Sequence, residues 1–105
     1  MRRQKNKVQL VKIMKTITVK HLEAIVSRIN RMTNSPQEPW TRQDGKTVAN
    51  IGCYHLDGAY GGYALHRMQS IGGGVQDIFR GHFTKRELSE KMFAFIAGIE
   101  AVQTN

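Results

Sequence analysis

The sequence predicts an α+β fold, with a small antiparallel sheet of two to four strands packed against two amphipathic helices. Two segments, one after Thr18 and one after Thr84, repeat apolar residues at helical spacing. The stretch between them is rich in glycine, tyrosine and turn dipeptides, which is typical of short strands. A chain of 105 residues holds one domain. We assign residues 14–105 to this domain and residues 1–13 to a basic N-terminal arm or extension.

The first helix follows Thr18, whose hydroxyl can accept a hydrogen bond from an unpaired amide of the first turn. Asn34-Ser35-Pro36 ends this helix, because proline disfavours helical geometry in the residue before it. An earlier segment, Val8–Met14, is apolar and β-branched enough to form an additional strand. The apolar stripe of the helix consists of Leu22, Ile25, Val26, Ile29 and Met32.

The second helix carries the clearest local signal in the chain. Thr84-Lys-Arg-Glu87 is a capping box, in which Thr84 caps the amide of Glu87 and Glu87 returns the bond. We expect the helix to run from Lys85 to about Val102. Its apolar stripe consists of Leu88, Met92, Phe95, Ile96, Ile99 and Val102.

The central stretch predicts a hairpin. Thr47–Leu56 reads as a strand, Asp57-Gly58 as a tight hairpin turn and Ala59–Gln69 as the partner strand. Gly61-Gly62 inside the partner strand suggests a bulge or a close approach to the backbone.

Turn residues divide the rest of the central region. Ser35–Lys46 is expected to be a loop with a turn signal at Asp44-Gly45, and Trp40 is expected to pack in the core. Gly72–Gly74 forms a second turn, and Val75–Phe79 follows as a third short strand.

The net charge of +8 arises largely at one end of the chain. Seven basic residues and no acid fall in the first 20 positions, whereas the chain from His21 onward has a net charge of +1. A basic arm can bind nucleic acid through phosphates, or it can be a solvated tail. We expect neither a membrane span nor a secretory signal, and the lone Cys53 fits a reducing cytoplasm.

The sequence gives little evidence for a catalytic site or a metal-binding site. Cys53 and His55 share one strand face, and the predicted turn places His66 well beyond both. Neither a CxxC nor an HExxH motif is present, so we expect no metal, no cofactor and no enzymatic activity.

Binding of an anion is better supported. A glycine-rich turn such as Gly72–Gly74 can present amides to a phosphate, although it lacks the P-loop motif. Arg86 lies in the first turn of a helix, where the dipole favours anions rather than cations. Arg67 lies between two glycine clusters, and Tyr60 and Tyr63 offer flat faces to a base.

Several runs of the chain resemble a known family. They are YHLDGAYGG from Tyr54, LHRM from Leu65, GGGV from Gly72, TKREL from Thr84 and AFIAGI from Ala94. Together they resemble the first described type of Thoeris anti-defence sponge, a family of small phage proteins, over about His21–Ala101. Residues 1–13 match nothing in that family.

The resemblance implies a cytoplasmic, non-enzymatic role in an infected bacterium. Such proteins sequester glyco-cyclic ADP-ribose signals made by TIR-domain proteins without cleaving them. Some members assemble as hexamers and bind cyclic dinucleotides or trinucleotides at separate sites. The positions that can serve in ligand binding are Arg28, Tyr60, Arg67, Gln69, Ser70, Gly73 and Arg86.

Two other functions stay open on the residues alone. The alternative is a small basic accessory or inhibitor protein that binds nucleic acid through its arm and exposed tyrosines. A further alternative is a structural homo-oligomer in which the glycines serve turns only.

Overall fold

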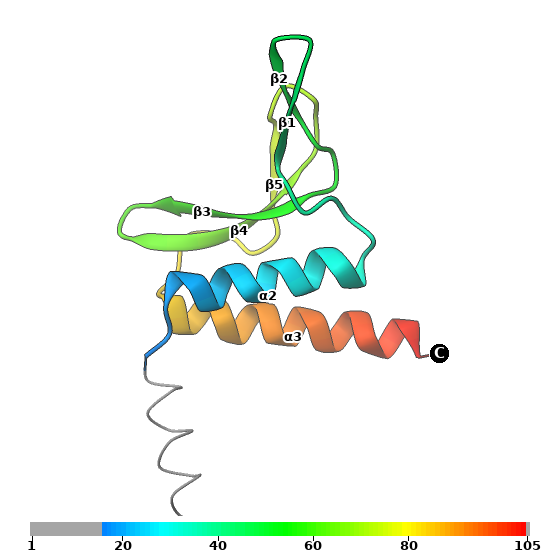
Figure 1. Ribbon diagram of the computed structural model, residues 1–105. Coiled ribbons are helices and arrows are strands. Elements are labelled where there is room, and N and C mark those ends of the chain that lie inside the picture. The colour runs from blue at the N-terminus through cyan, green and yellow to red at the C-terminus, as the bar shows by residue number, and fades with distance from the viewer. Residues whose placement is uncertain (1–15, 105) are drawn as a thin grey trace, which may run out of the picture.

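The computed structural model describes residues 16–104. The predicted arm and the predicted strand Val8–Met14 lie outside these residues. The described chain is an α+β fold of two helices and two small antiparallel sheets, which confirms the predicted fold class (Figure 1). The elements are, in order, α2 (Val19–Met32), β1 (Trp40–Gln43), β2 (Lys46–Ala49), β3 (Tyr54–Ala59), β4 (Gly62–Met68), β5 (Val75–Asp77) and α3 (Lys85–Gln103).

Helix α2 begins and ends as its sequence predicts. The Thr18 side chain accepts from the His21 amide at 3.2 Å, and Nδ1 of His21 accepts from the Thr18 amide at 3.2 Å. The histidine thus completes a capping box that usually contains Glu or Gln. Asn34 adopts a positive φ of 59° just beyond the helix, which is a common helix-terminating conformation for asparagine.

Helix α3 has the predicted capping box. The Glu87 amide donates to Thr84 Oγ1 at 3.1 Å, and Glu87 Oε1 accepts from the Thr84 amide at 3.0 Å. These bonds satisfy two of the amides that a helix start leaves unpaired. Within the predicted apolar stripe, Val102 is 76% exposed, so the prediction that it packs inward is wrong.

The region between the helices contains one more hairpin than predicted. Ser35–Lys46, expected to be a loop, includes strand β1, which pairs with β2. The Asp44-Gly45 turn is confirmed, with φ of 48° and 76°, as in the turns that match the twist of paired strands. The predicted single strand Thr47–Leu56 is wrong, because Gly52 turns the chain at a φ of 93° and separates β2 from β3.

The main hairpin turns three residues later than predicted. Its turn lies at Tyr60-Gly61, so Asp57 and Gly58 belong to β3, and the predicted turn at those two residues is wrong. Gly61-Gly62 is likewise part of the turn and the start of β4 rather than a bulge. Asp57 and Gly58 are residue types common in tight turns. A turn there is excluded because the observed register pairs Leu56 with Leu65, and both pack in the core.

The three-stranded sheet has the order β3-β4-β5 and is antiparallel throughout. Both helices pack on one face of it, α2 along β3 and α3 along β4, as predicted (Figure 1). Strand β3 is therefore an edge of the sheet. None of the helices within residues 16–104 combines the length and hydropathy needed to cross a membrane.

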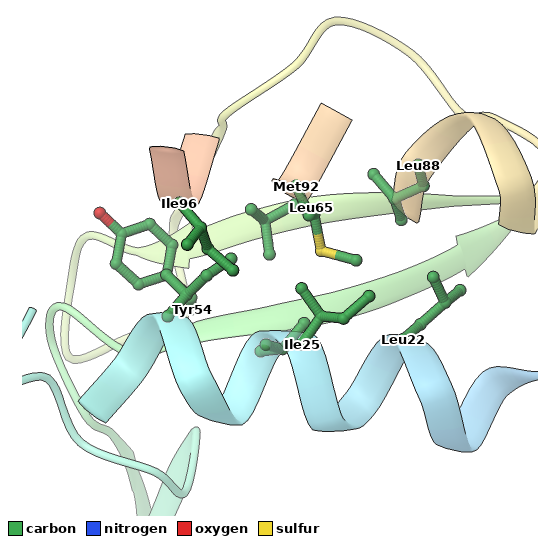
Figure 2. Packing of buried hydrophobic residues seen from close by; sticks show 9 residues of the cluster. Leu22, Ile25, Tyr54, Leu65, Leu88, Met92 and Ile96 are labelled. Carbon is green, nitrogen blue, oxygen red and sulfur yellow. The ribbon is translucent and has the colours of Figure 1, made fainter. Parts of the chain in front are cut away.

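The core lies between the helices and this sheet. Leu22 and Ile25 of α2 face Leu65 of the sheet and Met92 of α3 (Figure 2). Trp40 does not join this core, contrary to prediction. Its side chain is 45% exposed, because β1 belongs to the separate two-stranded sheet.

Candidate functional site

The tip of the main hairpin presents Tyr60 to solvent. Tyr60 has a φ of 54° and is 96% exposed, and its ring centroid lies 5.5 Å from that of His82. A bulky residue rarely adopts a positive φ, where asparagine or glycine costs less. The hairpin therefore holds an aromatic ring in solvent at a position that the backbone disfavours.

The start of α3 lies at the same end of the sheet. Tyr63 and Phe83 exchange two backbone hydrogen bonds of 2.8 Å, which places the segment after His82 beside the hairpin. Lys85 and Arg86 follow at once, in the first turn of α3. The positive end of the helix dipole adds to these two cations. Tyr60 and Arg86, both predicted site residues, are thus at one end of the molecule, which we call the hairpin end.

Four other predicted site residues lie at the opposite end of β4. Arg67 is next to last in the strand, and Gln69, Ser70 and Gly73 follow it. Strand β4 spans seven residues, so its two ends are about 20 Å apart at about 3.3 Å per residue. One copy of the chain does not bring these residues to Tyr60 and Arg86. We call this second region the glycine-turn end.

The triple glycine is organised as a turn. The Gly73 amide donates to the Ser70 carbonyl at 3.0 Å, and the Gly74 amide donates to Ser70 Oγ at 2.8 Å. Gly73 has a φ of 101°, and a Cβ there would lie 2.7 Å from Cη2 of Trp40. Two of the three amides are therefore used inside the turn, and Gly73 makes room for the indole ring.

Arg67 and Arg28, the other two arginines predicted to bind the ligand, differ in their surroundings. The Arg67 guanidinium lies 5.6 Å from the ring centroid of Tyr54, a cation–π contact. Arg28 forms a salt bridge of 3.6 Å with Glu100, which joins α2 to α3. Arg28 is thus part of the helix layer, and the pair is exposed enough to contribute little to stability.

A cluster that the sequence did not reveal lies on the sheet face opposite the helices. The histidine–aspartate cluster comprises His55, Asp57, His66, Asp77 and His82. His66 Nε2 lies 2.7 Å from Asp77 Oδ1, and His82 Nε2 lies 2.8 Å from Asp57 Oδ2. His55 pairs directly with His66, and their ring centroids are 5.8 Å apart. The prediction that His66 lies well beyond His55 is wrong, because the misplaced turn shifted the register.

Hydrogen bonding, burial and neighbouring charge shift the pKa values of two residues in this cluster. The hydrogen bond from His82 lowers the pKa of the Asp57 carboxyl below its ordinary value. Partial burial lowers the pKa of His55, and the neighbouring His66 acts in the same direction. These shifts favour the neutral form of His55 and the ionised form of Asp57.

Cys53 does not act as a nucleophile partner of this cluster. Cys53 is fully buried, and its Sγ donates to the Tyr54 carbonyl at 3.4 Å. Burial raises the pKa of the Cys53 thiol, and the nearby Glu38 carboxylate adds to the effect. His55 Nδ1 faces the Cys53 carbonyl rather than its sulfur. This arrangement favours an inert structural cysteine.

Metal ligation finds no support in the described part of the chain. Across residues 16–104, no group of three or more His, Cys, Asp or Glu residues is placed to hold a metal ion. Within the histidine–aspartate cluster, two ring nitrogens are engaged with carboxylates in separate pairs.

Two grooves stand out in the surface of residues 16–104. One of about 610 Å³ lies between α2, the 37–39 loop and β3, and we call it the edge groove. The other, about 550 Å³, follows α3 and is lined by Ala94, Phe95, Gly98, Ile99, Val102 and Gln103. Comparison with protein-family models, curated proteins and solved structures finds no match to this chain.

Proposed function

We propose that this protein is a phage anti-defence sponge of the Thoeris type, which binds a cyclic nucleotide signal and holds it without cleaving it. The ligand class is glyco-cyclic ADP-ribose, with cyclic dinucleotides or trinucleotides as further candidates. The protein acts in the cytoplasm of the infected bacterium. The resemblance described above supports this role, and so does the chemistry of the hairpin end.

Tyr60 is the observation that carries the proposal. Its ring is 96% exposed, at a φ of 54° that disfavours a bulky residue. Backbone strain of this kind concentrates at functional sites. An exposed aromatic ring can stack on a base, which contributes about 1–3 kcal/mol per base. Tyr60 would therefore stack on the adenine of the ligand.

Arg86 and Lys85 would bind the diphosphate. Both lie in the first turn of α3, where the helix dipole also attracts anions. Placing cations there opposes the local preference of a helix start, and such conflicts are typical of functional positions.

The glycine-turn end would complete the site from a neighbouring copy. Arg67, Gln69, Ser70 and Gly73 are too far from Tyr60 to reach the same small ligand within one chain. A homo-oligomer, either a dimer or a hexamer, would bring the two ends together. Val102, which is 76% exposed and lines the groove along α3, supports such assembly, because an exposed apolar side chain in a groove often marks an interface.

Calorimetry with purified glyco-cyclic ADP-ribose tests the proposal. Arg86→Ala should weaken binding by about 2–3 kcal/mol, the value of a charged hydrogen bond to phosphate. Arg42→Ala is the matched control, because Arg42 is an exposed cation on β1, in the two-stranded sheet and not at the hairpin end. Equal affinity of the two variants would remove Arg86 from the site.

The state of the ligand separates a sponge from an enzyme. Heating the complex should release the ligand chemically intact, whereas a cleaved product would identify a hydrolase. The nucleic-acid alternative makes a different prediction. It requires binding to DNA or RNA that falls steeply with salt and is lost on deletion of residues 1–13.

A further inference from the structure

Strand β3 has a free edge that opens into the edge groove. It is the first strand in the order β3-β4-β5, and no strand within residues 16–104 pairs with its other side. The groove is walled by α2 and by the 37–39 loop. A groove between a helix and an open strand edge is the geometry in which an extended peptide adds to a sheet.

The register shows which backbone groups of β3 point away from β4, on the side where the groove lies. Leu65 lies opposite Leu56, and its carbonyl accepts from Ile78 on the far side of β4. Tyr63 lies opposite Gly58, and both of its backbone groups bond to Phe83. Because backbone groups alternate sides along a strand, those of Leu56 and Gly58 point away from β4.

Asn30 shows how the rest of this edge is satisfied. Its side-chain amide donates to the Tyr54 carbonyl at 3.0 Å and accepts from the Tyr54 amide at 2.9 Å. Asn30 thus imitates a neighbouring strand at Tyr54 but does not extend to Leu56. Within residues 16–104, the next two outward-facing residues of β3 form no hydrogen bond of this kind, so their backbone groups can pair with those of an added strand.

The walls of the groove are fixed before any ligand binds. Gln37 Nε2 donates to the Ser27 carbonyl at 2.9 Å, which ties the loop to α2. Asn50 Nδ2 donates to the Glu38 carbonyl at 2.8 Å, which ties the same loop to the end of β2. A preformed groove lowers the entropic cost of binding.

The charge of the groove selects the occupant. Glu23 lies on its α2 wall and Glu38 on its loop wall. Neither carboxylate forms a salt bridge with any residue in the described range. The chain as a whole has a net charge of +8, so these acids are a local exception. Val26 and Leu56 add apolar surface between them.

We propose that the edge groove binds an extended basic peptide of a partner protein, which adds as a strand to β3 beside Leu56 and Gly58. Apolar side chains of the peptide pack toward Val26, and its lysines or arginines meet Glu23 and Glu38. The lining of the edge groove includes neither Tyr60 nor Arg86, and the proposal does not depend on nucleotide binding.

Fluorescence anisotropy with a labelled peptide of sequence KVTVKVTVK, acetylated and amidated, tests the charge requirement. The intact protein should bind this peptide and not its counterpart EVTVEVTVE. The double variant Glu23→Gln, Glu38→Gln should weaken binding about 5- to 10-fold, in the range of two exposed charge pairs. Glu90→Gln, an exposed acid on α3, is the control. Equal losses in the two variants, or no binding of KVTVKVTVK, would overturn the proposal.

Strand addition itself has a direct readout. Binding should slow hydrogen exchange of the Leu56 and Gly58 amides, whereas those of His55 and Asp57, which face β4, should change little. Peptides N-methylated on the valines, or instead on the lysines and threonines, should differ at least 10-fold in affinity, because only one set faces β3. Equal affinity of the two N-methylated peptides would contradict the proposal. So would a Glu23→Gln, Glu38→Gln variant that changes only self-association of the protein in sedimentation.

Discussion

Replacing Tyr60 by asparagine should raise stability and weaken ligand binding together. Tyr60 occupies a φ of 54°, which costs an ordinary L-residue about 1–2 kcal/mol. Asparagine visits this conformation readily, and Asn-Gly is the preferred pair for a two-residue hairpin turn. Tyr60→Asn should therefore relieve about 1 kcal/mol of strain.

The loss of the aromatic ring offsets part of this gain. Tyr60 contacts His82 edge to face at 5.5 Å. Such a pair contributes about 0.5–1.5 kcal/mol, and we take about 0.5 kcal/mol because 96% of Tyr60 is exposed. The variant should thus be about 0.5 kcal/mol more stable, which raises Tm by about 2–4 °C for a domain of this size. Loss of stacking should weaken nucleotide binding about 5- to 150-fold.

Thermal unfolding and calorimetry on the same preparation measure both effects. Asp44→Asn is the matched control, because Asp44 has a φ of 48° in the other hairpin. It should shift Tm little and leave ligand affinity unchanged. A Tyr60→Asn protein that melts lower than the parent and binds nucleotide equally well would refute both the strain estimate and the stacking role.

Three further predictions concern the frame of the site. Gly73→Ala should lower the free energy of unfolding, measured with urea, by about 1–3 kcal/mol. The new Cβ would lie 2.7 Å from the Trp40 ring, and the φ of 101° disfavours alanine. Gly72→Ala, which has open space around it, should leave the free energy of unfolding nearly unchanged. Asn30→Ala should cost about 2–4 kcal/mol in the same assay, since it leaves both backbone groups of Tyr54 without their buried partner; a loss below about 1 kcal/mol would contradict this bridging role. Because the pKa of His55 is lowered on folding, the unfolded chain binds its proton first, and stability should fall as pH drops below the ordinary histidine value of about 6.5. His55→Gln should flatten that slope between about pH 6.5 and 5, and an unchanged slope would exclude His55 as its source.

The helices were predictable because their signals are local. The capping box at Thr84 and the cap at Thr18 depend on residues three positions apart, and both form as expected. Leu22 and Met92 are buried because each lies on a stripe that repeats every helical turn. Val102 was wrongly predicted to be buried, because an apolar stripe does not show how far along the helix the neighbouring elements extend.

The sheet was less predictable because its register depends on distant contacts. Asp57-Gly58 and Tyr60-Gly61 are separated by three residues, and the first pair has the stronger turn statistics. Burial of Leu56 against Leu65 decides for the second pair. That choice also brings His55 beside His66, which is why the histidine–aspartate cluster could not be found from spacing alone.

The predicted ligand-binding residues fall at two ends of the sheet, and their placement also depends on contacts between residues distant in sequence. Tyr60 and Arg86 are 26 positions apart in sequence, yet the bridge between Tyr63 and Phe83 brings them to one end. Arg67 and Gly73 are closer to Tyr60 in sequence and lie at the other end of β4. A linear reading cannot show which of these residues a neighbouring copy would supply.

Retention of an intact cyclic nucleotide tests the central claim most directly. The protein would be expressed in bacteria together with an active TIR-domain enzyme, purified, and measured by native mass spectrometry before and after heat denaturation. We expect an oligomer that carries a glyco-cyclic ADP-ribose-type ligand, released unchanged on heating and retained at lower occupancy by Tyr60→Asn protein. A monomer without ligand, or a ligand recovered as a cleaved product, would contradict the proposed sponge function.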